Sequence, residues 1–186
     1  PEKVFGFTRE WTEKNPNTTN AVIKALILAG QRLDAEDENG VLINRPEAVQ
    51  ILAQSNYVGA PAEVIANSMT GFFEYEKGDK REVPDFNVFF RYNATYPYYS
   101  DAIWYLTQMR RWGQIAEPKS DDWYIDTAKS VYRADLYAVA AKALIADGIM
   151  DASEFPDFET ESGFKPEQTE FLDGVSYDGS KPNEYL

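Results

Sequence analysis

The sequence predicts a helix-rich portion of an α/β protein. Residues Lys3–Thr8 (KVFGFT) alternate apolar and small side chains, as a short strand does, whereas about six later segments have helical periodicity. A single strand can neither complete its own backbone hydrogen bonds nor bury both of its faces, so it needs a sheet from elsewhere. We therefore expect the other strands to lie upstream of Pro1, which would make this chain the C-terminal portion of the protein.

The first helices are indicated by their caps and by their apolar spacing. Arg9–Lys14 reads as one or two helical turns that end at Asn15-Pro16. One of the residues Asn17–Thr19 then caps a longer helix, because its side-chain oxygen accepts a backbone N–H that the first turn leaves unpaired. The apolar residues of this helix recur at three- and four-residue spacing, which predicts a buried face of Ala21, Val22, Ala25, Leu26, Ala29 and Leu33.

The same signals predict the later elements. The expected helices start at Asn44-Pro46 and at Pro61, and then run from Ser100 to Gly113, around Asp121–Val131 and around Arg133–Asp147. The stretch from Gly71 to Phe90 carries turn signals such as Lys77-Gly78-Asp79 and is expected to be irregular. Residues 155–186 are polar and acidic with isolated aromatic side chains, so we expect an extended tail that these side chains hold in place.

Composition and charge narrow the functional classes. The 186 residues include no Cys and no His, which excludes Cys nucleophiles, Ser-His-Asp triads and the usual zinc, copper and haem ligands. We therefore expect no enzyme, no metal and no other cofactor. The formal net charge of −13 repels phosphate backbones, so nucleic acid is not an expected partner. The acidic run Asp34–Asn39 does not match an EF-hand loop, and we interpret it as a solvated turn.

The stretch Asn93–Gly113 (NATYPYYSDAIWYLTQMRRWG) is unusually aromatic. Such a stretch could form a ligand platform, a stacking surface for nucleic acid or a core. Ser100 would cap its helix and Gly113 would end it. Trp104 and Trp112 fall at multiples of four residues, and an aromatic stripe at helical spacing is usually core. We therefore interpret both tryptophans as core residues.

Lys3 is a candidate anion ligand. It lies at the edge of the predicted first strand, and strand ends are where clefts open in α/β proteins. A lysine in that place can meet a small anion. From spacing alone, however, Lys3 reads as an ordinary surface lysine and not as a ligand.

Several stretches of the chain resemble one known family. They are PEKVFGFTREWTEKNPNTT at the start, YVGAPAEVI and NSMTGFF in the middle, RYNATYPYYSDAIWYLTQMRRWGQI after them, and DGVSYDG with PNEYL at the end. Together they make nearly the whole chain similar to the periplasmic nitrate-binding proteins of cyanobacterial ABC transporters, whose near relatives bind bicarbonate. YPYYSDAIWYLTQMRRWG is the most specific motif, because it is long and rare.

The resemblance implies a type II periplasmic binding protein fold with two lobes that close on one oxyanion. Residues 1–154 would be the C-terminal part of this solute-binding domain, with the return strand and the helices that cover one lobe. Residues 155–186 would be an acidic tail packed on that lobe. Most anion ligands would lie in the N-terminal part, outside this chain. A lipid anchor, also outside it, would tether the protein to the inner membrane in the periplasm.

The resemblance assigns one ligand in this chain, Lys3, which matches the family's lysine after Pro-Glu at the return strand. Nitrate is planar, monovalent and weakly hydrated, and one ammonium with several neutral donors suits it. The expected function is therefore high-affinity capture of nitrate, and of nitrite, for delivery to an ABC transporter's permease and ATPase. Two alternatives stay open: a bicarbonate-binding protein of the sister transporter, and the solute-binding-like regulatory domain of the transporter's ATPase subunit.

Overall fold

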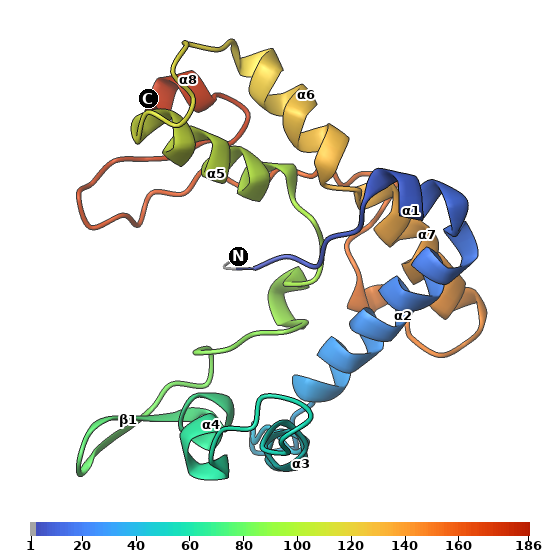
Figure 1. Cartoon of the computed structure of the whole chain (residues 1–186), viewed down its shortest axis with the longest axis vertical. Coiled ribbons are helices and arrows are strands. Elements are labelled where there is room, and N and C mark those ends of the chain that lie inside the picture. Colours follow the sequence, from blue (N-terminus) through green and yellow to red (C-terminus); the bar gives the residue numbers. More distant parts are fainter. Residues whose placement is uncertain (1–2) are drawn as a thin grey trace. The chain divides into compact units, whose positions relative to one another are not determined.

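The computed structural model describes residues 3–186, which are mainly helical (Figure 1). The helices are α1 (Arg9–Lys14), α2 (Pro16–Leu33), α3 (Arg45–Leu52), α4 (Ala62–Met69), α5 (Tyr99–Arg111), α6 (Asp121–Val131), α7 (Ala134–Ala146) and α8 (Pro182–Tyr185). Two short 3₁₀ helices, η1 (Arg91–Asn93) and η2 (Ala152–Glu154), and a hairpin of β1 (Phe72–Glu76) and β2 (Asp79–Glu82) complete the elements of this range. The many helices and few strands agree with the predicted helix-rich portion of an α/β fold.

The chain forms two compact units. The first contains residues 3–23 and 96–186, and the second contains residues 24–95. The tail at 155–186 belongs to the first unit together with α5, α6 and α7. The expected boundary at 154/155 therefore does not separate one compact unit from another. The assignment of residues 1–154 to one lobe stays a prediction.

The core of the first unit lies between α5 and α6. Ile103 on α5 and Tyr124 on α6 are completely buried against each other's helix. The helix α6 has the predicted bounds, since the Ser120 hydroxyl accepts a hydrogen bond from the Trp123 N–H (3.2 Å) and so caps its first turn. Its buried residues, Tyr124 and Ala128, are four positions apart, as one face of a helix requires.

The helix α5 begins differently from the prediction. Tyr98 occupies the N-cap position, while Ser100 lies inside the first turn and is buried. The Ser100 hydroxyl accepts a hydrogen bond from the backbone N–H of Lys165 (3.1 Å) in the tail. The prediction of Ser100 as the cap was wrong, because a segment distant in sequence uses this hydroxyl. At the other end, Gly113 follows α5 with φ +76°, a left-handed conformation that suits a helix stop.

The tail is fixed to α5 by backbone hydrogen bonds and by close packing. The Tyr99 N–H donates to the Gly163 carbonyl (2.8 Å). Gly163 has φ +80°, and a Cβ on it would come within 2.4 Å of the Tyr99 ring, so this crossing requires glycine. The short helix α8 packs on both α5 and α6.

The two tryptophans of the aromatic stretch have different environments. The Trp104 ring stacks on Phe171 (centroids 5.2 Å apart) and meets Tyr177 edge-on (4.9 Å), so it packs against the tail, where it is half-buried. Trp112 is 81% exposed at the C-cap position of α5, and its interpretation as a core residue was wrong. Eight residues at about 100° each turn Trp112 roughly 80° around the helix from Trp104, and the last helical turn has already ended there.

The second unit packs α3 against α4 and carries the hairpin. The core between these two helices contains the buried residues Val49, Ile65 and Met69. Strands β1 and β2 pair in antiparallel fashion, with Phe73 opposite Arg81, and the chain turns at Lys77-Gly78. The prediction of an irregular segment was wrong here. The second strand, DKRE, has no apolar residue, so it lacks the alternation that identifies a half-buried strand.

Two predictions at the N-terminal end were also wrong. Within the described residues, Lys3–Thr8 form neither helix nor strand. The helix α2 begins at Pro16 rather than after a cap at Asn17–Thr19. Proline suits the first helical position, where its missing N–H would have had no partner in the helix.

The buried side of α2 is not the predicted one. Thr19 and Ile27 are each 1% exposed. Leu26, by contrast, is 39% exposed, and Ala21 and Ala25 are exposed as well. The apolar stripe that the spacing indicates is therefore present, but the part of the chain that the structure describes does not cover it.

Candidate functional site

Lys3, the one predicted ligand, is exposed at the start of the irregular segment before α1. The segment is apolar: Val4 and Phe5 are 62% and 63% exposed. Phe7 meets Phe5 edge-on and stacks on Trp11, with 5.1 Å between ring centroids in both pairs. Lys3 therefore lies beside an exposed aromatic segment. The sequence predicted no second anion ligand that the structure could place beside Lys3. The role of Lys3 stays a prediction.

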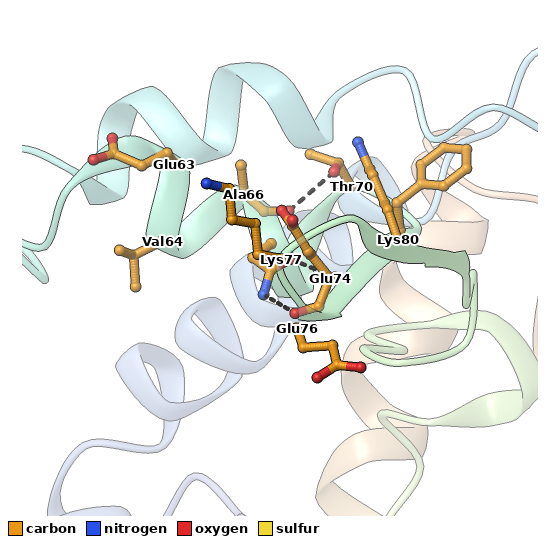
Figure 2. A pocket seen from close by; sticks show the side chains of 10 residues that line it. Glu63, Val64, Ala66, Thr70, Glu74, Glu76, Lys77 and Lys80 are labelled. Atoms are coloured by element: carbon orange, nitrogen blue, oxygen red, sulfur yellow. Dashed lines mark hydrogen bonds between the residues drawn. The ribbon is translucent and has the colours of Figure 1, made fainter.

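A groove of about 540 Å³ lies in the second unit between α4 and the hairpin (Figure 2). Its charged side chains have both signs and are Glu63, Glu74, Glu76, Lys77 and Lys80. The Asn67 amide is engaged with the backbone of Glu74, accepting from its N–H (2.7 Å) and donating to its carbonyl (3.3 Å). Thr70 donates to the Ala66 carbonyl (3.0 Å). Because acids outnumber bases and these neutral donors are already used, the groove does not suit an anion.

A smaller hollow of about 240 Å³ lies in the first unit between the start of α5 and the tail. Its one lysine, Lys165, contacts both carboxylate oxygens of Asp101 (2.9 and 2.8 Å). The Tyr177 hydroxyl donates to the Ser100 carbonyl (2.8 Å). Burial, followed by the nearby charge of Asp101, raises the pKa of Tyr177, so the phenol keeps the proton that it donates. These groups bind one another and fix the tail.

A buried ion pair organises the second unit. The Arg45 guanidinium lies 2.5 Å from one Asp34 carboxylate oxygen, and the two side chains are 1% and 2% exposed. The other Asp34 oxygen accepts hydrogen bonds from the backbone N–H groups of Phe89, Phe90 and Arg91 (2.8, 2.6 and 2.9 Å). Arg45 also donates to the carbonyls of Leu33, Met69 and Asn87. The pair thereby joins the end of α2, the start of α3, the end of α4 and the segment after the hairpin.

This ion pair is structural and offers nothing to a ligand. Burial by itself would raise the pKa of Asp34, but the backbone N–H groups and the Arg45 guanidinium outweigh it and lower that pKa. The carboxylate is therefore ionised, and its bonding capacity is used. The interpretation of Asp34–Asn39 as a solvated turn was wrong for Asp34 and right for Asp37, which is exposed and accepts from the Asn39 and Val41 N–H groups. No local signal in the sequence shows this, because the groups that bind Asp34 come from segments distant in the chain.

Residues 3–186 contain neither a metal site nor a membrane-spanning helix. No group of acidic side chains there is arranged to hold a metal ion. No helix in that range has the length and apolar character that crossing a membrane requires.

Known proteins resemble the chain along its whole length. Residues 1–53 match the NMT1-like family. The chain is 35% identical over 190 residues to the nitrate/nitrite binding protein NrtA of Nostoc sp. strain PCC 7120, an alignment that takes in 100% of the chain and 38% of that protein. It is 36% identical over 148 residues to the nitrate import ATP-binding protein NrtC of Synechocystis sp. strain PCC 6803, covering 77% of the chain and 20% of that protein.

The fold of the chain is also similar to that of a nitrate-binding protein. The crystal structure of the periplasmic nitrate-binding protein NrtA from Synechocystis PCC 6803 matches 95% of the chain with a TM-score of 0.78 and 29% identity. The match covers 42% of that structure, so the chain spans less than half the length of these relatives. Its helices and few strands are thus part of the α/β fold of a type II periplasmic binding protein. By sequence and by fold, the chain is similar to one part of the periplasmic nitrate-binding proteins.

Proposed function

We propose that this chain is part of a solute-binding protein that captures nitrate outside the cytoplasm for delivery to an ABC transporter. The observation that carries the proposal is the 35% identity of the whole chain to a nitrate/nitrite binding protein. In this proposal two lobes close on the anion, and no bond of the anion is made or broken. An N-terminal lipid anchor outside this chain tethers the protein in the periplasm.

Two features of the chain support a further sheet and further ligands outside it. Residues Val4–Phe7 belong to no strand within the described residues. The apolar stripe of α2, with Leu26 at 39% exposure, lacks a cover in the same part of the chain. Further strands beside Val4–Phe7 would complete the backbone hydrogen bonds of this segment, and a further surface on α2 would bury its apolar stripe. Most ligands of the anion then come from that remaining part.

Lys3 is the ligand that we propose within this chain. An ammonium group supplies one positive charge and three N–H donors to a monovalent anion, and a charged donor forms the stronger hydrogen bonds. Nitrite carries the same charge on the same kind of oxygen acceptors, so it suits the same donors. Closure of the lobes removes water from the pair, which strengthens the attraction between ammonium and anion.

Calorimetric titration of the full-length gene product that carries this chain tests the proposal. Nitrate and nitrite should each bind at one saturable site, and bicarbonate should give no heat. Lys3→Ala should weaken nitrate binding by about tenfold to a hundredfold, because a hydrogen bond to a charged group is worth about 1.5–3 kcal/mol. The matched control is Lys14→Ala, which removes an exposed lysine paired with Glu10 (2.6 Å) and should leave the affinity unchanged.

The outcomes separate the parts of the proposal. Heat with bicarbonate alone would contradict nitrate capture and favour a bicarbonate carrier. An unchanged nitrate affinity in Lys3→Ala would remove Lys3 from the site and leave the function standing.

A second candidate is the solute-binding-like domain of a transporter ATPase subunit. It is favoured by the 36% identity to a nitrate import ATP-binding protein over 77% of the chain. Such a gene product would also bind ATP. Titration of the full-length gene product with a non-hydrolysable ATP analogue therefore distinguishes the two, because a solute-binding protein should give no heat with it.

A further inference from the structure

Three consecutive backbone N–H groups of the second unit converge on one atom. Phe89, Phe90 and Arg91 all donate to the same Asp34 carboxylate oxygen, at 2.8, 2.6 and 2.9 Å. None of these three donors belongs to an α-helix or a strand, so they do not serve the hydrogen bonding of such an element. Successive N–H groups that face one side of the chain form a concavity that binds anions. The segment therefore has the form of an oxyanion-binding nest.

A guanidinium holds the other carboxylate oxygen. Arg45 Nη2 lies 2.5 Å from it, and a hydrogen bond between two charged groups is among the stronger ones. The side chains of Asp34 and Arg45 are 2% and 1% exposed. The described residues produce this burial by themselves, so any further chain can only add to it. Because water is excluded, the donors act on the anion more strongly than they would in solvent.

These donors, the N–H groups of residues 89–91 with the Arg45 guanidinium, form what we call the cradle. One more donor lies beside it: Arg91 Nε is buried and has no hydrogen-bond partner within residues 3–186. It is 3.9 Å from the nearer Asp34 oxygen, too far for a hydrogen bond. The other nitrogens of this guanidinium pair with Glu36 (2.6 Å) and Asp85 (3.1 Å). The tether of Asp34 to the backbone holds its carboxylate at this distance, whereas an untethered anion is free to shift toward Nε.

We propose that the cradle is an oxyanion-binding site in its own right, which the Asp34 carboxylate fills as an internal ligand. The ligand class is a small planar monocarboxylate. Formate is its simplest member, and it has the two oxygens and the single charge of the Asp34 side chain. In the wild type the cradle is filled, so free formate does not enter it. Without the Asp34 carboxylate the four donors would be buried without an acceptor, and formate would supply one. The inference does not rest on nitrate capture or on Lys3.

The variant Asp34→Gly of the full-length protein tests the proposal, because glycine removes the carboxylate together with its methylene. Hydrogen exchange of peptides from α3 and α4 is measured with increasing sodium formate, and sodium chloride keeps the ionic strength constant. A ligand of the folded form stabilises by RT ln(1 + [L]/Kd), so amide protection should rise about tenfold when formate is at about ten times its Kd. The rise should saturate in the sense of this relation for a single site. The wild type should not respond, since Asp34 fills its cradle.

Two variants serve as controls. Asp37→Gly removes a carboxylate whose oxygen also accepts from two backbone N–H groups, those of Asn39 and Val41 (2.9 Å each), but which is exposed. Water replaces this acceptor, so formate should give no gain in protection. The double variant Asp34→Gly/Arg45→Met removes the guanidinium from the cradle and should lose the formate response.

Equal formate responses of Asp34→Gly and Asp37→Gly would overturn the proposal, since formate would then act as a general salt. A folded Asp34→Gly protein that is indifferent to formate would overturn it too, because the cradle would then hold a carboxylate only when it is tethered. If Asp34→Gly does not fold in chloride, refolding from urea in formate or in chloride decides. Protection of α3 and α4 that returns in formate alone would support the cradle, and equal failure in both salts would contradict it. Absence of nitrate binding by the wild type would contradict the proposed function and leave this inference standing.

Discussion

Replacing Arg45 by Met should destabilise the second unit far more than the replacement of a surface arginine does. Methionine keeps the long apolar stem but removes the guanidinium. In the structure that group pairs with Asp34 at 2.5 Å, where the two side chains are 1% and 2% exposed. It also donates to the carbonyls of Leu33, Met69 and Asn87. The variant Arg45→Met therefore leaves a buried carboxylate without its counter-ion and three carbonyls without this donor.

The magnitude follows from the burial. Removing one partner of a buried ion pair costs about 3–5 kcal/mol, because the remaining charge stays uncompensated in a medium of low dielectric constant. A free energy of 1.4 kcal/mol corresponds to a factor of ten, so amide protection should fall by roughly two to three and a half orders of magnitude. The loss should concentrate in α3 and α4, whose ends the guanidinium joins.

Hydrogen exchange of the full-length protein, followed by mass spectrometry of peptides from α3 and α4, measures this loss. Arg32→Met is the matched control, since Arg32 pairs with Glu47 at 2.7 Å but the two side chains are 63% and 60% exposed. An exposed pair contributes about 0–1 kcal/mol, so the control should lose at most a fewfold protection. Equal losses in the two variants would refute the reasoning that burial sets the value of the Arg45–Asp34 pair.

Two further predictions concern acid stability and the tail. Because the pKa of Asp34 is lowered in the folded protein, the stability it supplies is present above the ordinary carboxyl pKa of about 3.9 and is lost as pH falls through the lower, folded value. The urea midpoint of the second unit should therefore fall in acid. In Asp34→Asn the midpoint should already be lower at neutral pH and should change less with pH. Parallel curves of midpoint against pH for the wild type and the variant would contradict this. Trp104→Ala should destabilise the first unit by about 3 kcal/mol and speed proteolysis of the tail, because it removes the ring on which Phe171 stacks. Trp112→Ala, at 81% exposure, should cost about 0.5 kcal/mol or less, and similar urea midpoints for the two variants would show that the tail does not depend on Trp104.

Little of the candidate site was predictable from the residues themselves. Lys3 came from a resemblance, and the structure shows it exposed at the start of an irregular segment. A ligand set is a property of side chains that the fold brings together, and local patterns do not record which side chains those are. The tail illustrates the same point, since Phe171 stacks on Trp104, which is 67 residues away in the chain (171 minus 104).

The sequence by itself determined several of the local elements. Helix α6 has its predicted bounds, and Gly113 ends α5, because caps, periodicity and left-handed glycines act over a few residues. The long motif around Trp104 also indicated the resemblance to the periplasmic nitrate-binding proteins before any geometry was known. These signals are contained within single segments, so no partner is needed to read them.

Only the tertiary structure decided which apolar and charged residues are buried. It buried Asp34 with Arg45 and left the apolar stripe of α2 without a cover among the described residues. It also packed Trp104 under the tail while Trp112 stayed in solvent. Spacing along a helix shows that residues share a face, but burial requires a second surface on that face. That surface comes from segments distant in the chain, and so its presence is decided by the fold.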